Sequence, residues 1–327
     1  MYPLKSLQDL LTARLEKEAG LIGIADPFNL YHPIQYALSM GGKRLRPVMV
    51  LQACDLFGGK IEDAMNPALA IEIFHNFTLL HDDIMDKAGM RRNRPTVHQK
   101  YNENIAILSG DAMSIMAYRY LLQTDSPARH ELVELFTKTA IEVCEGQQYD
   151  MDFEKRMDVS ISDYMKMIRL KTAVLIACSL KTGALIGNAS AADAEHIYNF
   201  GINLGLAFQL QDDLLDVFAD QNKFGKKIGG DIVANKKTFL LLKTLELATP
   251  EQREQLMYWI SPKAYNQEEK IRAVKQIYTA NKIREITEEI IDHLYGQAVS
   301  ELEALDIEQE RKKELLLLSG KMMKREK

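Results

Sequence analysis

The feature of this sequence that most limits its possible folds is the spacing of its apolar residues, which recur every three or four positions along nearly the whole chain. The first segment is typical, with Leu4, Leu7, Leu11 and Leu15. An α-helix has 3.6 residues per turn, so this spacing gathers the apolar side chains on one face. Strands would require alternation, and no alternating run with a hairpin signal is present. The sequence therefore predicts an all-α fold.

Prolines indicate where the predicted helices begin and end. Because proline cannot continue an α-helix, seven of the nine prolines are interpreted as helix boundaries: Pro33, Pro47, Pro67, Pro95, Pro127, Pro250 and Pro262. The predicted helices span residues 4–19, 43–57, 64–86, 104–123, 128–152, 162–187, 191–219, 236–247, 251–259, 268–279 and 282–319. No Gly/Ser-rich linker separates them, so we predict a single domain over residues 1–327.

Composition argues against several classes of protein. A net charge of −5 gives no basis for a nucleic-acid partner. The cysteines Cys54, Cys144 and Cys178 form no C-x-x-C pair, so neither a zinc site nor a disulfide framework is predicted. The first residues do not resemble a signal peptide, and charged residues interrupt each apolar run before membrane-spanning length. We expect a cytoplasmic protein without a transmembrane segment.

Two acidic motifs of identical spacing, D-D-x-x-D, lie inside apolar helical sequence. They are Asp82, Asp83 and Asp86 in LLHDDIMD, and Asp212, Asp213 and Asp216 in QLQDDLLD. On a helix the first and last carboxylates of a motif lie about 40° apart and roughly 6 Å along the axis. On an exposed helix such a pair would be a solvated acidic face, costing a few tenths of a kcal/mol. Partly buried, the pair repels by about 3 kcal/mol and requires a cation or a proton.

The ligand atoms of these motifs favour Mg²⁺. Carboxylate oxygens are hard ligands, and Mg²⁺ uses few of them, completing its shell with water and phosphate oxygens. Two such motifs on facing helices would hold a Mg²⁺–phosphate assembly. His81 precedes the first motif, but no second histidine has metal-ligand spacing, so we interpret His81 as structural.

Basic residues flank both acidic motifs, as a phosphorylated substrate requires. They are Lys43, Arg44 and Arg46 in GGKRLRP; Arg91, Arg92 and Arg94 in MRRNRPT; Lys171 in RLKTA; and Lys226, Lys227, Lys236 and Lys237 in GKKIGGDIVANKKT. Each residue alone would be read as a solvated surface charge. Arginine, however, contacts phosphate through two parallel hydrogen bonds, and the joint arrangement favours a diphosphate site.

These motifs, with ILSGDAM and EGQQYD, occur in the order found in trans-isoprenyl diphosphate synthases, which the sequence resembles from about residue 40 to 240. The resemblance implies a large helical bundle of the isoprenoid synthase type around a deep central cavity, usually as a homodimer. It implies a Mg²⁺-dependent prenyltransferase, with three ions when substrate is bound. The reaction would join isopentenyl diphosphate head to tail to an allylic diphosphate and release inorganic diphosphate.

The resemblance also implies roles for individual residues. The metal ligands would be Asp82, Asp86 and Asp212, supported by Asp83, Asp213 and Asp216. The allylic diphosphate would contact Arg91, Lys171, Lys227 and Lys236, and isopentenyl diphosphate would contact Lys43, Arg46, His75 and Arg92. Residues beside the reacting carbons would be Thr172 and Gln209, and those lining the allylic region would be Gln147 and Asp150.

Three positions depart from the family pattern. Asn93 and Asn102 stand where glycine is common, and we expect both to adopt the left-handed conformation that asparagine tolerates. The segment before IGGD carries an extra lysine, so Lys226 is an alternative to Lys227.

Two phenylalanines precede the first motif. Phe77 lies five residues before Asp82, about 7.5 Å along the helix, and Phe74 lies one turn further back. Both would fit ordinary core packing. In the family that the sequence resembles, an aromatic residue five positions before the motif forms the floor of the cavity and limits product length. With Thr78 at the fourth position and no insertion in the motif, the resemblance implies a product of fifteen to twenty carbons.

Three alternatives compete with this interpretation. A class I terpene cyclase would need no isopentenyl diphosphate site, a non-catalytic partner subunit of a prenyl synthase would usually lack one acidic motif, and a helical scaffold would bind no metal. The basic C-terminal segment from Arg311 to Lys327 is interpreted as a frayed, solvated tail. Closure over the diphosphates or contact with anionic lipid are its alternatives.

Overall fold

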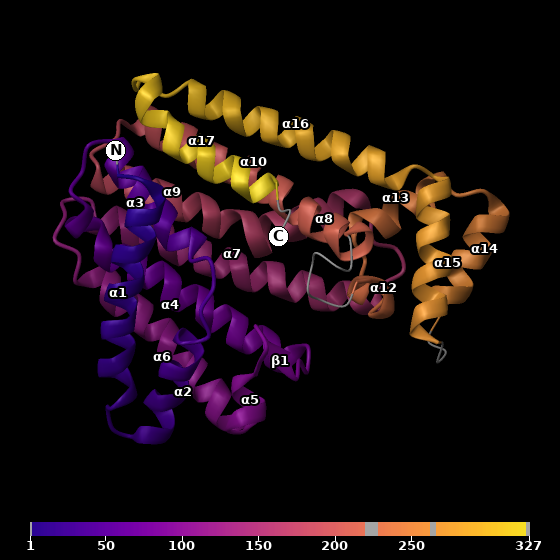
Figure 1. Ribbon diagram of the computed structural model, residues 1–327, viewed down its shortest axis with the longest axis horizontal. Helices are drawn as coiled ribbons and strands as arrows, with labels where there is room; N and C mark the ends of the chain where they lie inside the picture. The colour runs from indigo at the N-terminus through magenta and orange to yellow at the C-terminus, as the bar shows by residue number, and fades with distance from the viewer. Residues whose placement is uncertain (1, 220–227, 262–265, 325–327) are drawn as a thin grey trace. The chain divides into compact units, whose positions relative to one another are not determined.

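The computed structural model describes residues 2–219, 228–261 and 266–324, and nearly all of their regular structure is helical (Figure 1). This confirms the all-α prediction. The chain divides into two compact units: unit 1 comprises Met1–Lys138, Cys178–Tyr198 and Leu305–Leu315, and unit 2 comprises Thr139–Ala177, Asn199–Ala304 and Leu316–Lys327. A single domain over residues 1–327 stays a prediction.

The elements of each unit come from distant parts of the sequence. Unit 1 contains α1 (Leu4–Gly23), α2 (Phe28–Leu38), α3 (Leu45–Leu56), α4 (Ile61–Met85), β1 (Met90–Arg91), β2 (Arg94–Pro95), α5 (Val97–Lys100) and α6 (Glu103–Leu122). Unit 2 contains α8 (Ile161–Ile168), the π-helix η1 (Arg169–Ala173), α12 (Gly230–Val233), α13 (Phe239–Leu247), α14 (Pro250–Ile260), α15 (Gln267–Ala280) and α16 (Ile283–Glu303). Both units receive residues from α7 (Arg129–Lys155), α9 (Val174–Ile186), α10 (Ala191–Phe218) and α17 (Gln309–Met323).

In unit 1, α4 is the central helix and packs against both α3 and α6. Residues 67–74 are buried at every position, as expected for a helix that is covered on all sides. The C-terminal end of α4 is less covered and carries the first acidic motif. The same helix therefore connects the core of unit 1 to its aspartates.

In unit 2, a capping box stabilises the start of α8, and close backbone contacts hold η1, which follows it. Ser160 and Asp163 form a capping box at the start of α8. At η1, the backbone is approached closely by two glycines, because a Cβ atom at Gly146 would lie 2.3 Å from the Lys171 nitrogen and one at Gly205 would lie 2.5 Å from Ala173 Cα. A larger side chain at either glycine would push against main chain, so α7 and α10 hold η1 in place.

Several expected boundaries are wrong. Pro33 and Pro67 lie inside α2 and α4 rather than at boundaries, and α2 was not predicted at all. Tertiary packing overrides the proline signal there, because Ile34, Tyr36 and Leu38 of α2 are buried. The predicted helix 162–187 is interrupted by the π-helix η1.

The predicted helix 282–319 is divided into α16 and α17. The break carries no glycine or proline signal. It is stabilised by a contact distant in sequence, since the Asp306 backbone nitrogen donates to Asp193 Oδ1 at 3.1 Å. The frayed-tail interpretation is also wrong as far as Met323, because α17 is helical, Lys312 is buried and Arg311 donates to the Asp55 carbonyl.

The two unusual asparagines behave differently. Asn93 has φ +60° in the turn between the two-residue strands β1 and β2, which confirms the expected left-handed conformation. Asn102 has an extended backbone instead, and its side chain caps α6 by accepting from the Ile105 nitrogen at 2.8 Å. The expectation for Asn102 was wrong because a helix N-cap, not a turn, occupies that position.

None of the helices in the described ranges combines the length and the apolar content needed to cross a bilayer.

The close contact at Gly205 leads to a prediction. Gly205→Ala should lower the free energy of unfolding by about 1–3 kcal/mol, because the new methyl group meets the Ala173 backbone. Gly296→Ala is the matched control in α16, where a Cβ atom meets nothing within 4 Å, and it should stabilise by about 0.5–1 kcal/mol. Urea unfolding of both variants measures the difference, and equal shifts would contradict the packing argument.

Candidate active site

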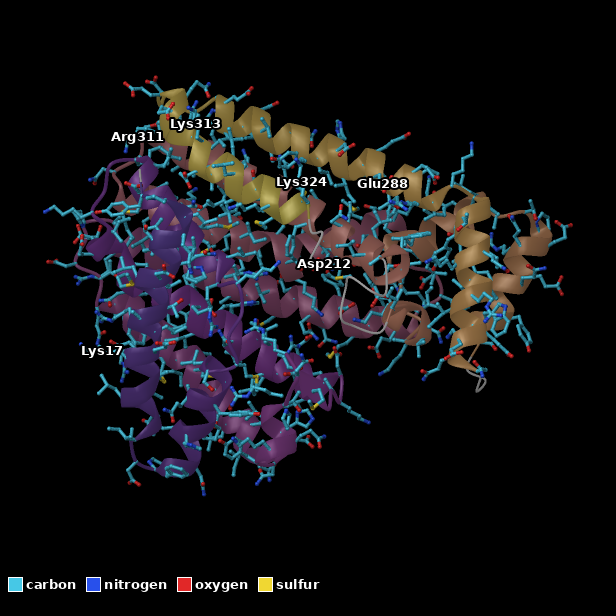
Figure 2. The ribbon with its side chains drawn as sticks, in the orientation of Figure 1. Lys17, Asp212, Glu288, Arg311, Lys313 and Lys324 are labelled. Carbon is cyan, nitrogen blue, oxygen red and sulfur yellow. The ribbon has the colours of Figure 1, made fainter. Side chains whose placement is uncertain are left out.

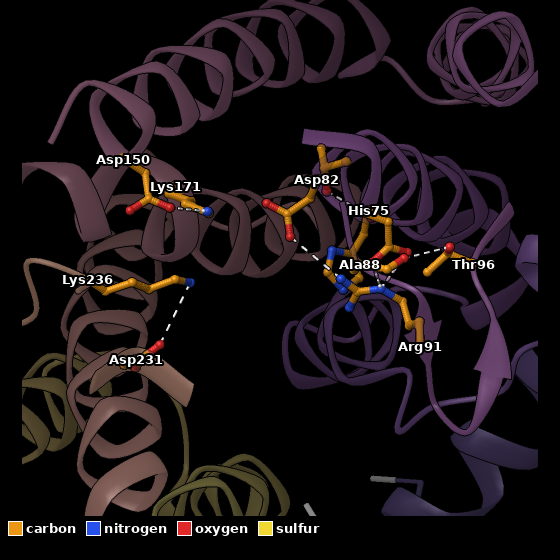
Figure 3. A network of polar contacts seen from close by, with 11 residues as sticks. His75, Asp82, Ala88, Arg91, Thr96, Asp150, Lys171, Asp231 and Lys236 are labelled. Carbon is orange, nitrogen blue, oxygen red and sulfur yellow. Dashed lines mark hydrogen bonds and ion pairs between the residues drawn. The ribbon is translucent and has the colours of Figure 1, made fainter. Parts of the chain in front are cut away.

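The first acidic motif turns its middle aspartate inward and the other two outward. Asp83 is 3% exposed, and its Oδ1 and Oδ2 accept hydrogen bonds from Arg91 Nε at 2.8 and 2.9 Å. Asp82 is partly exposed and lies 3.6 Å from Arg91 Nη2, an ion pair drawn in Figure 3. Asp86 is exposed. Burial raises the pKa of Asp83, and the guanidinium of Arg91 opposes that rise.

A second set of basic residues surrounds His75 in unit 1. Arg46 Nη1 lies 3.2 Å from His75 Nε2, and burial together with the charges of Arg46 and Arg92 lowers the pKa of His75 well below its usual value. His75 is therefore neutral at physiological pH. Arg92 donates to the Gly41 carbonyl, and its guanidinium lies where a Cβ atom of Gly42 would be. The structure thus brings GGKRLRP and RRNRPT together, as predicted for one anion site.

Arg44 differs from its neighbours in this set. Its guanidinium is buried and paired with Glu72, which is itself 2% exposed. Arg44 adopts a left-handed conformation, with φ +49°, immediately before α3. Its charge is already matched, so Arg44 shapes the loop, whereas Lys43 beside it is exposed.

The two phenylalanines of α4 lie in a chain of aromatic contacts within unit 1. Phe74 is buried, with its ring centroid 5.4 Å from that of Phe77 and 5.0 Å from that of Phe136. Phe77 is half-buried, and its ring also contacts His81 at 4.8 Å. His81 Nε2 lies 3.1 Å from the Ile107 carbonyl, consistent with a structural histidine. Phe74 therefore packs against Phe77 from within the core of unit 1.

The second acidic motif repeats the arrangement of the first, with different partners. Asp213 is buried, and its Oδ2 accepts from the Tyr164 hydroxyl at 2.5 Å while its Oδ1 accepts from Gln209 Nε2 at 3.0 Å. Asp212, labelled on α10 in Figure 2, is only partly buried. Asp216 accepts from the Asp231 backbone nitrogen at 3.0 Å, so it anchors the start of α12.

A cavity of about 110 Å³ in unit 2 joins most of the residues predicted there. Its lining residues with predicted roles are Asp150, Lys171, Thr172, Gln209, Asp213 and Lys236, and its further polar ones are Tyr164, Asp231, Lys237 and Thr238. Two ion pairs, both drawn in Figure 3, cross it: Lys171 Nζ lies 2.6 Å from Asp150 Oδ2, and Lys236 Nζ lies 3.8 Å from Asp231 Oδ1. Lys171 and Thr172 belong to η1, a wide helical turn of a kind often found at functional sites.

Acidic side chains crowd together in this cavity. Burial and the charge of Asp231 raise the pKa of Asp213 to about 8, despite the hydrogen bonds from Tyr164 and Gln209. Burial and the charge of Asp216 raise the pKa of Asp231 to about 6, which Lys236 opposes. These carboxyls lie close enough to disfavour each other's ionisation, which a cation would relieve.

Three residues of these sites were missed by sequence reasoning. Asp231 was quoted in IGGD but given no role, although its position between two lysine pairs was a usable signal. Tyr164 and Glu72 gave no signal, because they lie in helical sequence far from the residues they contact. The roles predicted for Lys227 and Lys226 lie outside the described residues.

The described carboxylates do not form a metal cage by themselves. Within residues 2–219, 228–261 and 266–324, no group of three or more His, Cys, Asp or Glu side chains could hold a metal ion. The outward aspartates offer hard oxygen ligands in small number. That donor set fits Mg²⁺ only together with water and phosphate oxygens, which is how Mg²⁺ is usually bound.

Comparisons with known proteins agree with this chemistry. The sequence model of the polyprenyl synthetase family matches residues 28–278. A geranylgeranyl diphosphate synthase of Sulfolobus acidocaldarius is 41% identical over 244 residues, covering 73% of this chain and 74% of that protein. The crystal structure of a geranylgeranyl pyrophosphate synthase superposes with a TM-score of 0.94 at 44% identity, over 100% of both chains.

A more distant structure contains ligands. It is a polyprenyl synthase from Caulobacter crescentus in complex with calcium and isoprenyl diphosphate, with a TM-score of 0.87, 25% identity and coverage of 98% of this chain and 97% of that one. The family match covers most of this chain and confirms the resemblance found in the sequence: the chain belongs to the polyprenyl synthetase family.

Proposed function

We propose that this prenyltransferase joins isopentenyl diphosphate head to tail to an allylic diphosphate and makes an all-trans prenyl diphosphate of fifteen to twenty carbons. The main observation in support of the proposal is that the two acidic motifs have the same pattern of burial. In each, the middle aspartate is buried against a side chain of the site, while the first aspartate is only partly buried. A scaffold without ligands would not require either feature.

Asp82 and Asp86 of unit 1 and Asp212 of unit 2 are the proposed Mg²⁺ ligands, with three ions when substrate is bound. Bound Mg²⁺ would neutralise the negative charge that develops on the leaving diphosphate. Support for this assignment comes from the greater exposure of these carboxylates compared with Asp83 and Asp213, which are 3% and 6% exposed. The resemblance to the calcium-bound relative gives further support.

The cationic residues are proposed to bind the two diphosphates. In unit 1, Lys43, Arg46, His75 and Arg92 would bind isopentenyl diphosphate; neutral His75 adds no charge but keeps Arg46 in place. The allylic diphosphate would contact Arg91, Lys171, Lys236 and Lys227, the last of which lies outside the described residues. A second anion site of this kind argues against a terpene cyclase, which would use a single diphosphate.

The reaction balances without a further co-reactant. The allylic C1–O bond breaks and its electron pair leaves with the diphosphate. The double bond of isopentenyl diphosphate then attacks C1, a new C–C bond forms, and a proton is lost to the released diphosphate. The chain's task is to hold both diphosphates and keep water from the cation, for which Thr172 and Gln209 are the proposed neighbours of the reacting carbons.

We also propose a homodimer that works in the cytoplasm. On α6, Leu108, Ile115 and Leu122 recur every seven residues and are 59%, 70% and 58% exposed, which forms an apolar stripe of the kind that second copies cover. The free thiols of Cys54, Cys144 and Cys178 suit a reducing compartment. A monomeric mass in sedimentation equilibrium would contradict the dimer.

Elongation tests the proposed function directly. Purified protein with Mg²⁺, isopentenyl diphosphate and dimethylallyl, geranyl or farnesyl diphosphate should yield longer prenyl diphosphates, and EDTA should abolish their formation. Asp82→Ala and Asp212→Ala should each lower kcat by about 10²-fold or more, because stabilisation of the leaving group is lost. Asp125→Ala, an exposed aspartate outside the site, is the control. No elongation from any primer would refute the proposal.

Product length tests the role of Phe77. Phe77→Ala should shift the products to longer chains by one or more five-carbon units, because the half-buried ring would no longer limit the cavity. Phe28→Ala removes a 56% exposed ring elsewhere in unit 1 and should leave the distribution unchanged. Chromatographic sizing of the dephosphorylated products separates the two outcomes, and identical distributions for Phe77→Ala and wild type would show that the floor lies elsewhere.

A further inference from the structure

A chain of hydrogen bonds in unit 2 connects a residue of α8 to a residue of η1, and the hydrogens from both ends are donated toward Asp213. The Tyr164 hydroxyl donates to Asp213 Oδ2 at 2.5 Å. The other oxygen of Asp213 accepts from Gln209 Nε2 at 3.0 Å, and Gln209 Oε1 accepts from the Thr172 hydroxyl at 2.9 Å. All four residues line the cavity.

The chain of hydrogen bonds begins at a buried residue, Tyr164. Tyr164 is 1% exposed and packs in the hydrophobic core of unit 2, one turn after the capping box that starts α8. Its hydroxyl donates to the carboxyl of Asp213, which is also buried. Buried polar groups need partners, so the phenol and the carboxyl hold each other's position.

The acceptor at the centre of the chain, Asp213, determines which way Gln209 points. An amide can present either its oxygen or its nitrogen to a neighbour, and the two orientations are nearly isosteric. Asp213 Oδ1 is an acceptor, so it selects the Nε2 side of Gln209. The Oε1 side must then face Thr172, whose hydroxyl hydrogen is used in that bond. The remaining lone pairs of Thr172 Oγ1 are left to accept.

We propose that Tyr164 is a positioning residue that acts through Asp213 and Gln209 to fix the Thr172 hydroxyl with its oxygen, rather than its hydrogen, available to the reacting carbon. This inference rests on the proposed function, which places Thr172 beside that carbon. An oxygen lone pair stabilises positive charge at C1 of the allylic group, whereas a hydroxyl hydrogen would oppose it. Because the dipole is oriented before ionisation, it costs no reorganisation during the reaction.

A double-mutant cycle tests this role. Tyr164→Phe keeps the ring and removes the hydroxyl, and Thr172→Val removes the last hydroxyl of the chain. Each should lower kcat by about tenfold, with the KM values for both substrates changed less than about twofold. If Tyr164 acts through Thr172, Tyr164→Phe should lower kcat less than about twofold further in the Thr172→Val background.

The matched control is Tyr120→Phe, which removes a buried phenol hydroxyl that donates to the Glu18 carboxylate in unit 1. It should leave kcat within about twofold of wild type. A Tyr164→Phe variant with wild-type kcat, or losses that multiply in the double variant, would overturn the proposal.

Gln209→Met provides a second background for the same test. It breaks the chain at its middle, and adding Tyr164→Phe should again lower kcat less than about twofold. A further loss in this background would show that Tyr164 does not act through Gln209 and would overturn the proposal. Elongation by the wild-type protein distinguishes failure of this inference from failure of the proposed function. If the wild type elongates a primer but the double-mutant cycle gives independent losses, this inference is wrong and the proposed function stands.

Discussion

The structure depends on how it accommodates carboxylates that are buried in apolar helices. An ionised group removed from water must find hydrogen bonds inside the protein. Asp83 finds them in Arg91, and Asp213 finds them in Tyr164 and Gln209. In both motifs the partner carries or orients a polar group of the site. Burial of the middle aspartate therefore fixes Arg91 in one motif and Tyr164 and Gln209 in the other, while the first aspartates stay partly exposed.

The same logic of charge matching separates structural cations from those available to substrate. Arg44 is matched by buried Glu72, whereas Arg91 is shared between Asp82 and Asp83 and keeps 27% of its side chain exposed. Arg46 lies beside neutral His75, and Arg92 donates to the Gly41 carbonyl. In unit 2, Lys171 and Lys236 meet aspartates whose own neighbours are acidic. The clustered arginines of unit 1 would suit a diphosphate, and the crowded carboxyls of unit 2 would suit a cation.

Local sequence predicted what depends on spacing along one helix. The twin aspartate motifs, the basic motifs beside them and the left-handed Asn93 could all be read from the sequence. What could not be read depends on contacts between distant segments. Tyr164 reaches Asp213 across 49 residues, and Asp306 ends a helix by binding Asp193. The π-helical turn that carries Lys171 is also set by contacts with Gly146 and Gly205 rather than by its own residues.

The central claim is that the middle aspartate of each motif binds groups of the protein, while Asp82, Asp86 and Asp212 bind metal. Anomalous scattering from Mn²⁺ tests this claim most directly. A crystal grown with Mn²⁺ and a non-hydrolysable allylic diphosphate should show peaks at coordination distance, about 2.0–2.2 Å, from Asp82, Asp86 and Asp212. Asp83 and Asp213 should keep their bonds to Arg91 and Tyr164. Manganese bound to either of these middle aspartates, or none at the outer ones, would contradict the account.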